Sequence, residues 1–200
     1  AGASPETLVK LEDGVLHTFP LAGTRPRGKD AAEDERLRTE LLGDEKERAE
    51  HNMLVDLGRN DLGKVSKYGS VEVEDYMAVL QYSHVMHIGS TVRGEIRDDK
   101  DSLDAVDAVL PAGTLSGAPK IRAMEIIDEL ENNRRNLYTG SIGYLTLDGD
   151  CDFNIVIRTA LHKDGMYYLG VGGGITAESD LEFEYEETLQ KAKAVLEAMK

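Results

Sequence analysis

The sequence lacks the features that mark secreted and membrane proteins. It has a single cysteine, Cys151, no apolar run that approaches the roughly 20 residues of a membrane span, and no N-terminal signal peptide. One cysteine excludes an internal disulfide and fits a reducing compartment. We therefore expect a soluble protein of the cytoplasm that has no membrane partner.

Positive charge is also scarce. The 200 residues carry 23 Lys and Arg against 38 Asp and Glu, which gives a formal net charge of −15. Because no local basic patch offsets this excess, we expect no nucleic-acid partner. The net charge does not exclude a small anionic substrate, since local cations or a bound metal outweigh the net charge at short range.

The sequence contains no internal repeat and no low-complexity linker, and its 200 residues suffice for one domain with a substantial core. It opens at Ala1 without a methionine, and strand-like sequence follows almost at once. We therefore expect the chain to be a piece of a longer protein.

Hydrophobic periodicity and turn residues predict a series of strands and helices. Residues 7–20 alternate around Asp13-Gly14 as a hairpin, whereas the Pro- and Gly-rich segment 20–28 predicts a loop. The other expected elements are strands at 82–97, 141–147, 152–161 and 166–171, and helices at 33–57 (in two pieces around Gly43-Asp44), 102–110, 119–131 and from Ser179, where Glu182 completes a capping box. Tight turns between strands, beside long helices, predict an α+β fold with a mainly antiparallel sheet.

Four glutamates form two pairs in helical stretches at opposite ends of the chain. Glu47 and Glu50 are spaced three residues apart, as are Glu184 and Glu187, which places each pair on one helix face. Two such faces supply the oxygen ligands that Mg²⁺ prefers and leave waters for a substrate to displace. The alternative is that both are ordinary solvated helix faces.

Two glycine-rich segments are candidates for anion binding. The segment 113–120 runs into a helix N-terminus, where free backbone N–H groups and the helix dipole favour an anion, although its spacing is not that of a P-loop. The run Gly172–Gly174 follows a strand and lets the backbone approach a ligand closely. Either segment can instead be a plain loop whose glycines serve only the backbone geometry.

Arg158 and His87 are both expected on strands. Arg158 lies among apolar residues, so its guanidinium needs an anionic partner, either a substrate carboxylate or an internal Asp or Glu. His87 faces away from the apolar side of its strand, but a lone histidine is more often structural than catalytic. In the same way, Thr24, Arg25 and Arg27 can be no more than a turn with solvated arginines.

Several blocks of the sequence resemble the chorismate-utilising enzymes, in family order and over essentially the whole chain. The blocks are 20–28 (PLAGTRPRG), 50–61 (EHNMLVDLGRND), 85–87 (VMH), 113–120 (GTLSGAPK), 138–140 (YTG), 155–159 (IVIRT), the glycine run, and 184–191 (EYEETLQK). The resemblance implies two large antiparallel sheets flanked by helices, with the functional site between them.

The resemblance also implies a role for each matched residue. Glu50 and Glu187 would bind Mg²⁺, with Glu47 and Glu184 adding direct or water-mediated contacts. His87 would be the acid–base residue near the departing ring hydroxyl, and Thr114 is grouped with it as catalytic. The residues expected to hold chorismate or line its pocket are Gly23, Thr24, Tyr138, Arg158, Gly172, Gly173, Gly174 and Lys191, together with Thr114.

Within this family, the closest resemblance is to the large subunits of anthranilate synthases. It implies a lyase of tryptophan biosynthesis that aminates chorismate at C2 with ammonia, in the presence of Mg²⁺, and then eliminates pyruvate. A glutamine amidotransferase subunit would deliver the ammonia, so the complete protein would be a hetero-oligomer. Residues 1–200 would form the C-terminal part of the chorismate-binding domain, whose N-terminal strands lie upstream.

Other functions stay open. Aminodeoxychorismate synthases carry a lysine where Ala22 stands, and that lysine is thought to divert amination to C4, so Ala22 favours attack at C2. Isochorismate and salicylate synthases share the metal-binding glutamates but usually lack the block 113–120. A different class of function is a folded fragment or binding module that keeps the glutamates and turns nothing over.

Overall fold

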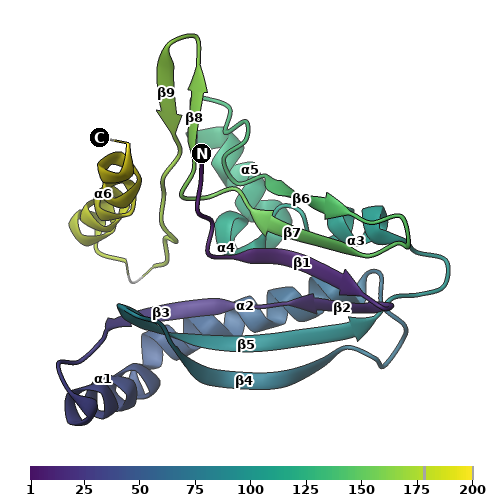
Figure 1. Cartoon of the computed structure of the whole chain (residues 1–200), viewed down its shortest axis with the longest axis horizontal. Coiled ribbons are helices and arrows are strands. Elements are labelled where there is room, and N and C mark those ends of the chain that lie inside the picture. Colours follow the sequence, from purple (N-terminus) through teal and green to yellow (C-terminus); the bar gives the residue numbers. More distant parts are fainter. Residues whose placement is uncertain (178, 200) are drawn as a thin grey trace. The chain divides into compact units, whose positions relative to one another are not determined.

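The chain divides into two compact units, and each is described by itself. The computed structural model describes residues 1–177 and 179–199 (Figure 1). Unit 1 comprises residues 1–7, 110–144 and 153–200, and unit 2 comprises residues 8–109 and 145–152. Both contain helices and antiparallel strands, which confirms the predicted α+β class. That residues 1–200 belong to a single domain stays a prediction.

Unit 2 is built on an antiparallel sheet with β5 at its centre. Its strands are β1 (Thr7–Glu12), β2 (Val15–Thr18), β3 (Leu21–Pro26), β4 (Glu72–Gln81) and β5 (Val85–Glu95). β5 pairs with β4 along one edge and with β2 and β3 along the other (Figure 1). β1 pairs with β2 in the predicted hairpin, whose turn residues Asp13 and Gly14 have φ values of 50° and 78°. β7 (Cys151–Ile155) follows β1 in the strand order.

Alternation along β5 separates the core from the opposite face of the sheet. Met86, Ile88 and Val92 are completely buried, whereas His87 is only partly buried. Met86 and Ile88 pack with the equally buried Leu41 in one core cluster. His87 therefore projects from the face opposite this core, as its strand position predicts.

The helices of unit 2 begin at aspartate caps. α1 (Ala31–Gly43) and α2 (Glu45–Gly63) confirm the predicted break at Gly43-Asp44, although α2 extends beyond the predicted end at residue 57. The Asp44 side chain accepts hydrogen bonds from the backbone N–H groups of Lys46 and Glu47, which fixes the start of α2. Asp101 caps α3 (Ser102–Val109) in the same way, since its side chain accepts hydrogen bonds from the backbone N–H groups of Leu103 and Asp104.

The predicted loop at 20–28 is wrong, because Leu21–Pro26 form β3. Among the described strands β5 is its only partner, so β3 is an edge strand. Its register shifts between Ala22 and Thr24, where Gly23 has a φ of 65°. An edge strand with a bulge tolerates the glycine and proline that argued against a strand.

Unit 1 holds a two-stranded ribbon and several helices. Its elements are α4 (Gly113–Ser116), α5 (Lys120–Leu130), β6 (Ser141–Leu145), which pairs with β7, the antiparallel strands β8 (Ala160–Lys163) and β9 (Met166–Leu169), and α6 (Leu181–Ala198). α6 is capped by Asp180, whose carboxylate accepts from Phe183 N. The predicted capping box is wrong, because the Ser179 hydroxyl accepts from Thr176 N instead. No helix in the described ranges is long and apolar enough to cross a membrane.

The single strand predicted at 152–161 is also wrong. β7 ends at Ile155 and β8 begins at Ala160, and Arg158 lies between them with a φ of 50°. A residue in the left-handed region interrupts an extended ladder. Arg158 therefore lies in a connection rather than on a strand.

Candidate functional site

In unit 2, His87 contacts the backbone and side chain of the β3 bulge. Its Nδ1 atom lies 2.9 Å from the carbonyl oxygen of Gly23 and 3.1 Å from the hydroxyl oxygen of Thr24. A carbonyl oxygen can only accept, so Nδ1 carries a proton and donates it to Gly23. This assigns Nε2 as the ring nitrogen that is free to exchange a proton with a ligand.

The bulge also lies against Glu47 of α2. A Cβ atom added at Gly23 would stand 3.1 Å from Glu47 Oε2 and 2.9 Å from Leu41 Cδ1. Together with the left-handed φ of Gly23, this close approach disfavours a side chain at that position. Unit 2 therefore brings together three predicted site elements: the Gly23-Thr24 segment, His87 and Glu47.

Arg25 connects the β3 bulge to α1 and α2 through ion pairs. Its guanidinium lies 3.1 Å from a Glu40 oxygen, 3.0 Å from an Asp44 oxygen and 3.5 Å from Glu47 Oε1, and its side chain is only 20% exposed. The alternative of a solvated arginine is therefore wrong for Arg25. Sequence reasoning missed this role, and the only signal was the excess of acidic residues in the helices that follow.

Glu50 lies one turn along α2 from Glu47 and is followed by the completely buried His51. His51 Nε2 lies 2.6 Å from the Ser90 hydroxyl on β5, which anchors this part of the helix to the sheet. Burial lowers the pKa of His51, so its ring is held in the neutral form.

In unit 1, the glycine run lies close to both Tyr138 and α6. A Cβ atom at Gly172 would stand 3.0 Å from the Tyr138 hydroxyl oxygen. One at Gly173 would stand 3.4 Å from Glu184 Oε2 and 3.7 Å from Lys191 Nζ. The glycines thus allow the backbone to approach these side chains, so unit 1 brings together the predicted residues of this run, of Tyr138 and of α6.

The two predicted metal-binding glutamates of α6 have partners within the helix or just before its start. Glu187 forms an ion pair with Lys191, one turn further on. Glu184 accepts a hydrogen bond of 2.9 Å from the Ser179 hydroxyl. Both carboxylates are therefore held in defined positions on the helix, next to the glycine run.

Thr114 lies in α4, where its hydroxyl donates a hydrogen bond of 2.8 Å to Glu6 Oε1. Burial raises the pKa of the Glu6 carboxyl, and the hydrogen bond from Thr114 and the charge of Arg158 oppose this shift. Sequence reasoning missed Glu6, because a single glutamate before a strand carries no spacing signal. The structure thus adds a partly buried acid, Glu6, to the two predicted residues Thr114 and Arg158.

The metal ligands stay a prediction, as do the roles of the other site residues. Within residues 1–177 and 179–199, no group of three or more His, Cys, Asp or Glu side chains is arranged to hold a metal ion. Each of α2 and α6 contributes two carboxylates, and their oxygen donors suit Mg²⁺ chemically. Convergence of Glu50 and Glu187 on one ion stays a prediction.

The structure therefore defines an α+β protein in which each unit sets glutamates on a helix beside a glycine-containing segment. A model of the chorismate binding enzymes matches residues 1–197. The chain belongs to this family of chorismate binding enzymes.

Individual members of the family are similar to this chain to different degrees. Anthranilate synthase component 1 of Aquifex aeolicus is 57% identical over 198 residues, which cover 99% of this chain and 40% of that protein. The crystal structure of anthranilate synthase component I from Streptococcus pneumoniae matches with a TM-score of 0.89 at 49% identity, over 97% of this chain and 42% of that one. The menaquinone-specific isochorismate synthase of Escherichia coli matches with a TM-score of 0.85 at 28% identity, over 97% and 44% of the two chains. The chain thus spans about 40% of the length of such a curated relative.

Proposed function

We propose that this chain carries the chorismate-converting site of an anthranilate synthase large subunit. The observation that carries the proposal is the 57% identity to an anthranilate synthase component 1 over almost the whole chain. The local geometry supports it, because His87 is bound to the Gly23-Thr24 segment and the glycine run approaches Tyr138, as the assigned roles require.

The reaction joins ammonia to C2 of chorismate while the C4 hydroxyl departs as water. Removal of the C2 proton and cleavage of the bond between C3 and the enolpyruvyl oxygen then release pyruvate and leave the aromatic anthranilate. His87 has the right chemistry for the first step, since Nε2 of its imidazolium form can give a proton to the departing hydroxyl.

The residues proposed to bind the dicarboxylate substrate are Gly23 and Thr24 in unit 2 and, in unit 1, Tyr138, Arg158, Gly172, Gly173, Gly174 and Lys191. Arg158 supplies a permanent cation, and Lys191 a second one close to Gly173. The backbone of Gly172–Gly174 can present N–H groups to a carboxylate, and the Tyr138 hydroxyl lies beside Gly172. Thr114 and Glu6 form a hydrogen-bonded pair that can hold a proton near the reacting ring.

Glu50 and Glu187 are the proposed holders of Mg²⁺, with Glu47 and Glu184 in adjacent positions on the same two helices. When bound, Mg²⁺ supplies Lewis acidity at the ring carboxylate. Arg25 keeps Glu47 in place, and Lys191 and Ser179 do the same for Glu187 and Glu184.

The wider context follows from the same assignment. We propose a cytoplasmic protein of tryptophan biosynthesis that receives ammonia from a glutamine amidotransferase subunit. Ala22 favours this subtype over an aminodeoxychorismate synthase, because it offers no amine to the ring. The competing proposal is a folded piece without turnover, and the share of about 40% of the relative's length motivates it.

Fluorescence tests the proposal directly. The chain, and the natural gene product that contains it, are mixed with chorismate, Mg²⁺ and an ammonium salt at alkaline pH. We expect the emission of anthranilate from the gene product. Emission from neither protein, with both folded by circular dichroism, contradicts the enzymatic function.

A further inference from the structure

The Tyr138 side chain projects from a tightly held turn of unit 1. Tyr138 N donates to the carbonyl oxygen of Arg135, and Thr139 N donates to that of Val156, each over 3.1 Å. Asn136 and Thr139 on either side have φ values of 52° and 67°, in the left-handed region. These backbone contacts fix the position of the Tyr138 Cα atom. The ring needs further contacts to fix the position of its hydroxyl group.

Gly170 supplies one part of that support. A Cβ atom built on Gly170 would stand 2.2 Å from Tyr138 Cγ and 2.6 Å from Tyr138 Cβ and Cδ2. Real atoms do not approach so closely, so the tyrosine occupies the space in which a side chain would lie. The same ring carries its hydroxyl to Gly172, within the proposed substrate-binding backbone.

Arg135 supplies the other part. Its guanidinium carbon lies over the Tyr138 ring, 5.9 Å from the ring centroid, which is within the range of a cation–π interaction. Glu131 holds the guanidinium in two places, with Nε–Oε2 and Nη2–Oε1 distances of 2.9 Å and 2.6 Å. Nη1 also donates to the carbonyl oxygen of Leu115 over 3.3 Å.

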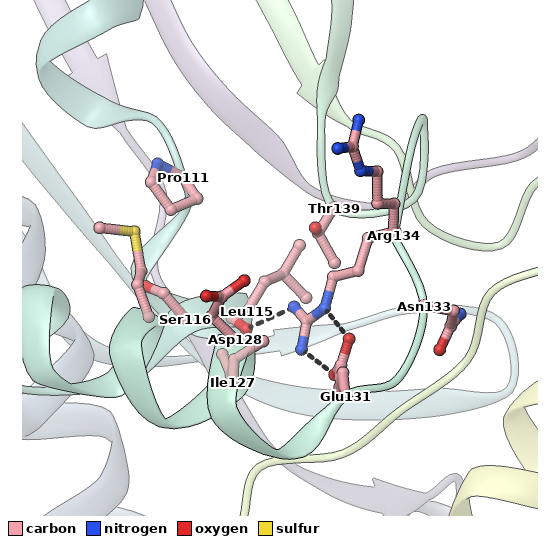
Figure 2. Close-up of a pocket in the computed structure, with 11 residues that line it drawn as sticks. Pro111, Leu115, Ser116, Ile127, Asp128, Glu131, Asn133, Arg134 and Thr139 are labelled. Atoms are coloured by element: carbon pink, nitrogen blue, oxygen red, sulfur yellow. Dashed lines mark hydrogen bonds and ion pairs between the residues drawn. The ribbon is translucent and has the colours of Figure 1, made fainter.

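Glu131 and Arg135 also line a surface pocket of unit 1. Dashed lines at Glu131 in Figure 2 mark the contacts that Glu131 makes with the Arg135 guanidinium. The neighbouring Arg134 lines the same pocket and is exposed. Within the part of the chain that the structure describes, its guanidinium makes no ion pair or hydrogen bond. The two adjacent arginines therefore differ, since Arg135 is partly buried and fixed against the tyrosine ring, whereas Arg134 is exposed.

We propose that Arg135, fixed by Glu131, and Gly170 are positioning residues that set the Tyr138 hydroxyl for substrate binding. The inference deepens the proposed chorismate site and rests on it. Arg135 and Gly170 act through the ring and need not touch the substrate. The fork of an arginine suits this task, since one guanidinium can face a ring while it satisfies a carboxylate and a carbonyl oxygen.

The test compares Arg135→Gln with Arg134→Gln in the natural gene product that contains this chain. The two variants remove the same charge from adjacent positions, so any long-range effect on an anionic substrate is shared. Arg135→Gln removes the cation–π contact and should raise the dissociation constant and the KM for chorismate about two- to thirtyfold. Arg134→Gln should leave both constants unchanged. The kcat should stay the same, because the lost interaction concerns binding. Glu131→Gln should reproduce part of the rise.

A second comparison asks whether Arg135 acts through the hydroxyl of Tyr138. In a Tyr138→Phe background, Arg135→Gln should weaken chorismate binding little further, whereas independent effects multiply. Gly170→Ala should also weaken binding, and Gly43→Ala, where an added methyl group meets nothing within 4 Å, should not. Equal effects of the two arginine variants, or multiplying effects in the double variant, overturn the proposal.

A ligand-free readout separates this proposal from the proposed function. With ring-¹³C tyrosine, the Tyr138 resonance is identified by its loss in Tyr138→Phe. It should shift in Arg135→Gln and stay in place in Arg134→Gln. An unchanged resonance overturns the positioning role even if anthranilate is formed. A shifted resonance in a protein that neither binds nor converts chorismate supports the positioning of the ring and contradicts the proposed function alone.

Discussion

His87 Nδ1 lies 2.9 Å from the carbonyl oxygen of Gly23, and this contact fixes how the imidazole can act. Because the carbonyl oxygen accepts only, the proton on Nδ1 is committed to the β3 bulge. Nε2 is then the nitrogen that can lose and regain a proton. This hydrogen bond links Gly23, of the block 20–28, to His87, of the block 85–87.

His87→Ala should lower kcat by roughly 10²- to 10⁴-fold in the natural gene product, the usual scale for a general acid–base residue. The melting temperature should barely fall, because His87 lies on the face opposite the core residues Met86 and Ile88. His87→Asn is the matched control, since its amide can still donate to Gly23 but cannot exchange a proton. It should retain stability and lose the same activity. A destabilised alanine variant with near-normal turnover per folded molecule would show a structural histidine.

Ala22→Lys tests the choice between C2 and C4. Ala22 lies on β3 beside the bulge, in register with Ile88 of β5. An amine placed next to the ring competes with ammonia through its high effective concentration. We expect less anthranilate and some C4-modified product or covalent adduct, detected by mass spectrometry. Unchanged anthranilate turnover with no new product would remove the basis for the subtype assignment.

Glu6 predicts a pH dependence of stability. Its pKa is raised above 4.5, chiefly by burial, so the folded state holds the proton more tightly than the unfolded state does. The contribution of Glu6 is therefore fully present below pH 4.5 and is lost as pH rises through the folded pKa. We expect the melting temperature of wild type to fall relative to that of Glu6→Gln as pH rises from 4.5. Parallel pH profiles of the two proteins would refute the raised pKa.

Gly23→Ala tests the close approach of the bulge to Glu47. The left-handed φ of 65° and the 2.9 Å distance to Leu41 Cδ1 both penalise a methyl group. We expect a loss of about 1–2 kcal/mol in the free energy of unfolding from the backbone alone, measured by urea titration. Gly63→Ala in α2, where an added methyl group meets nothing within 4 Å, is the control and should not destabilise. Equal stabilities of the two variants would contradict the geometry.

Local sequence signals predict much of this fold. The hairpin at Asp13-Gly14, the helix break before Asp44 and the outward face of His87 follow from turn chemistry, capping and the two-residue strand period. The misassigned elements, β3 and the connection at Arg158, depend on tertiary context. An edge position tolerates breakers, and a left-handed residue in an apolar run has no local marker.

The site shows the same division. The candidates Gly23, His87 and Gly172–Gly174 stood out by residue type and family resemblance. Glu6 could not be identified from the sequence, because its contact with Thr114 joins residues that are 108 positions apart. The role of Arg25 was hidden for a related reason, since its three carboxylates come from two different helices and the cap between them. Such side-chain partners are brought together only by the tertiary structure.

The most direct test of the central claim is the product formed from chorismate and ¹⁵N-ammonium with Mg²⁺ by the natural gene product. Mass spectrometry should show anthranilate that carries one ¹⁵N atom, together with an equal amount of pyruvate. Labelled aminodeoxychorismate, unlabelled isochorismate or salicylate, or unchanged chorismate in the presence of folded protein would contradict amination at C2.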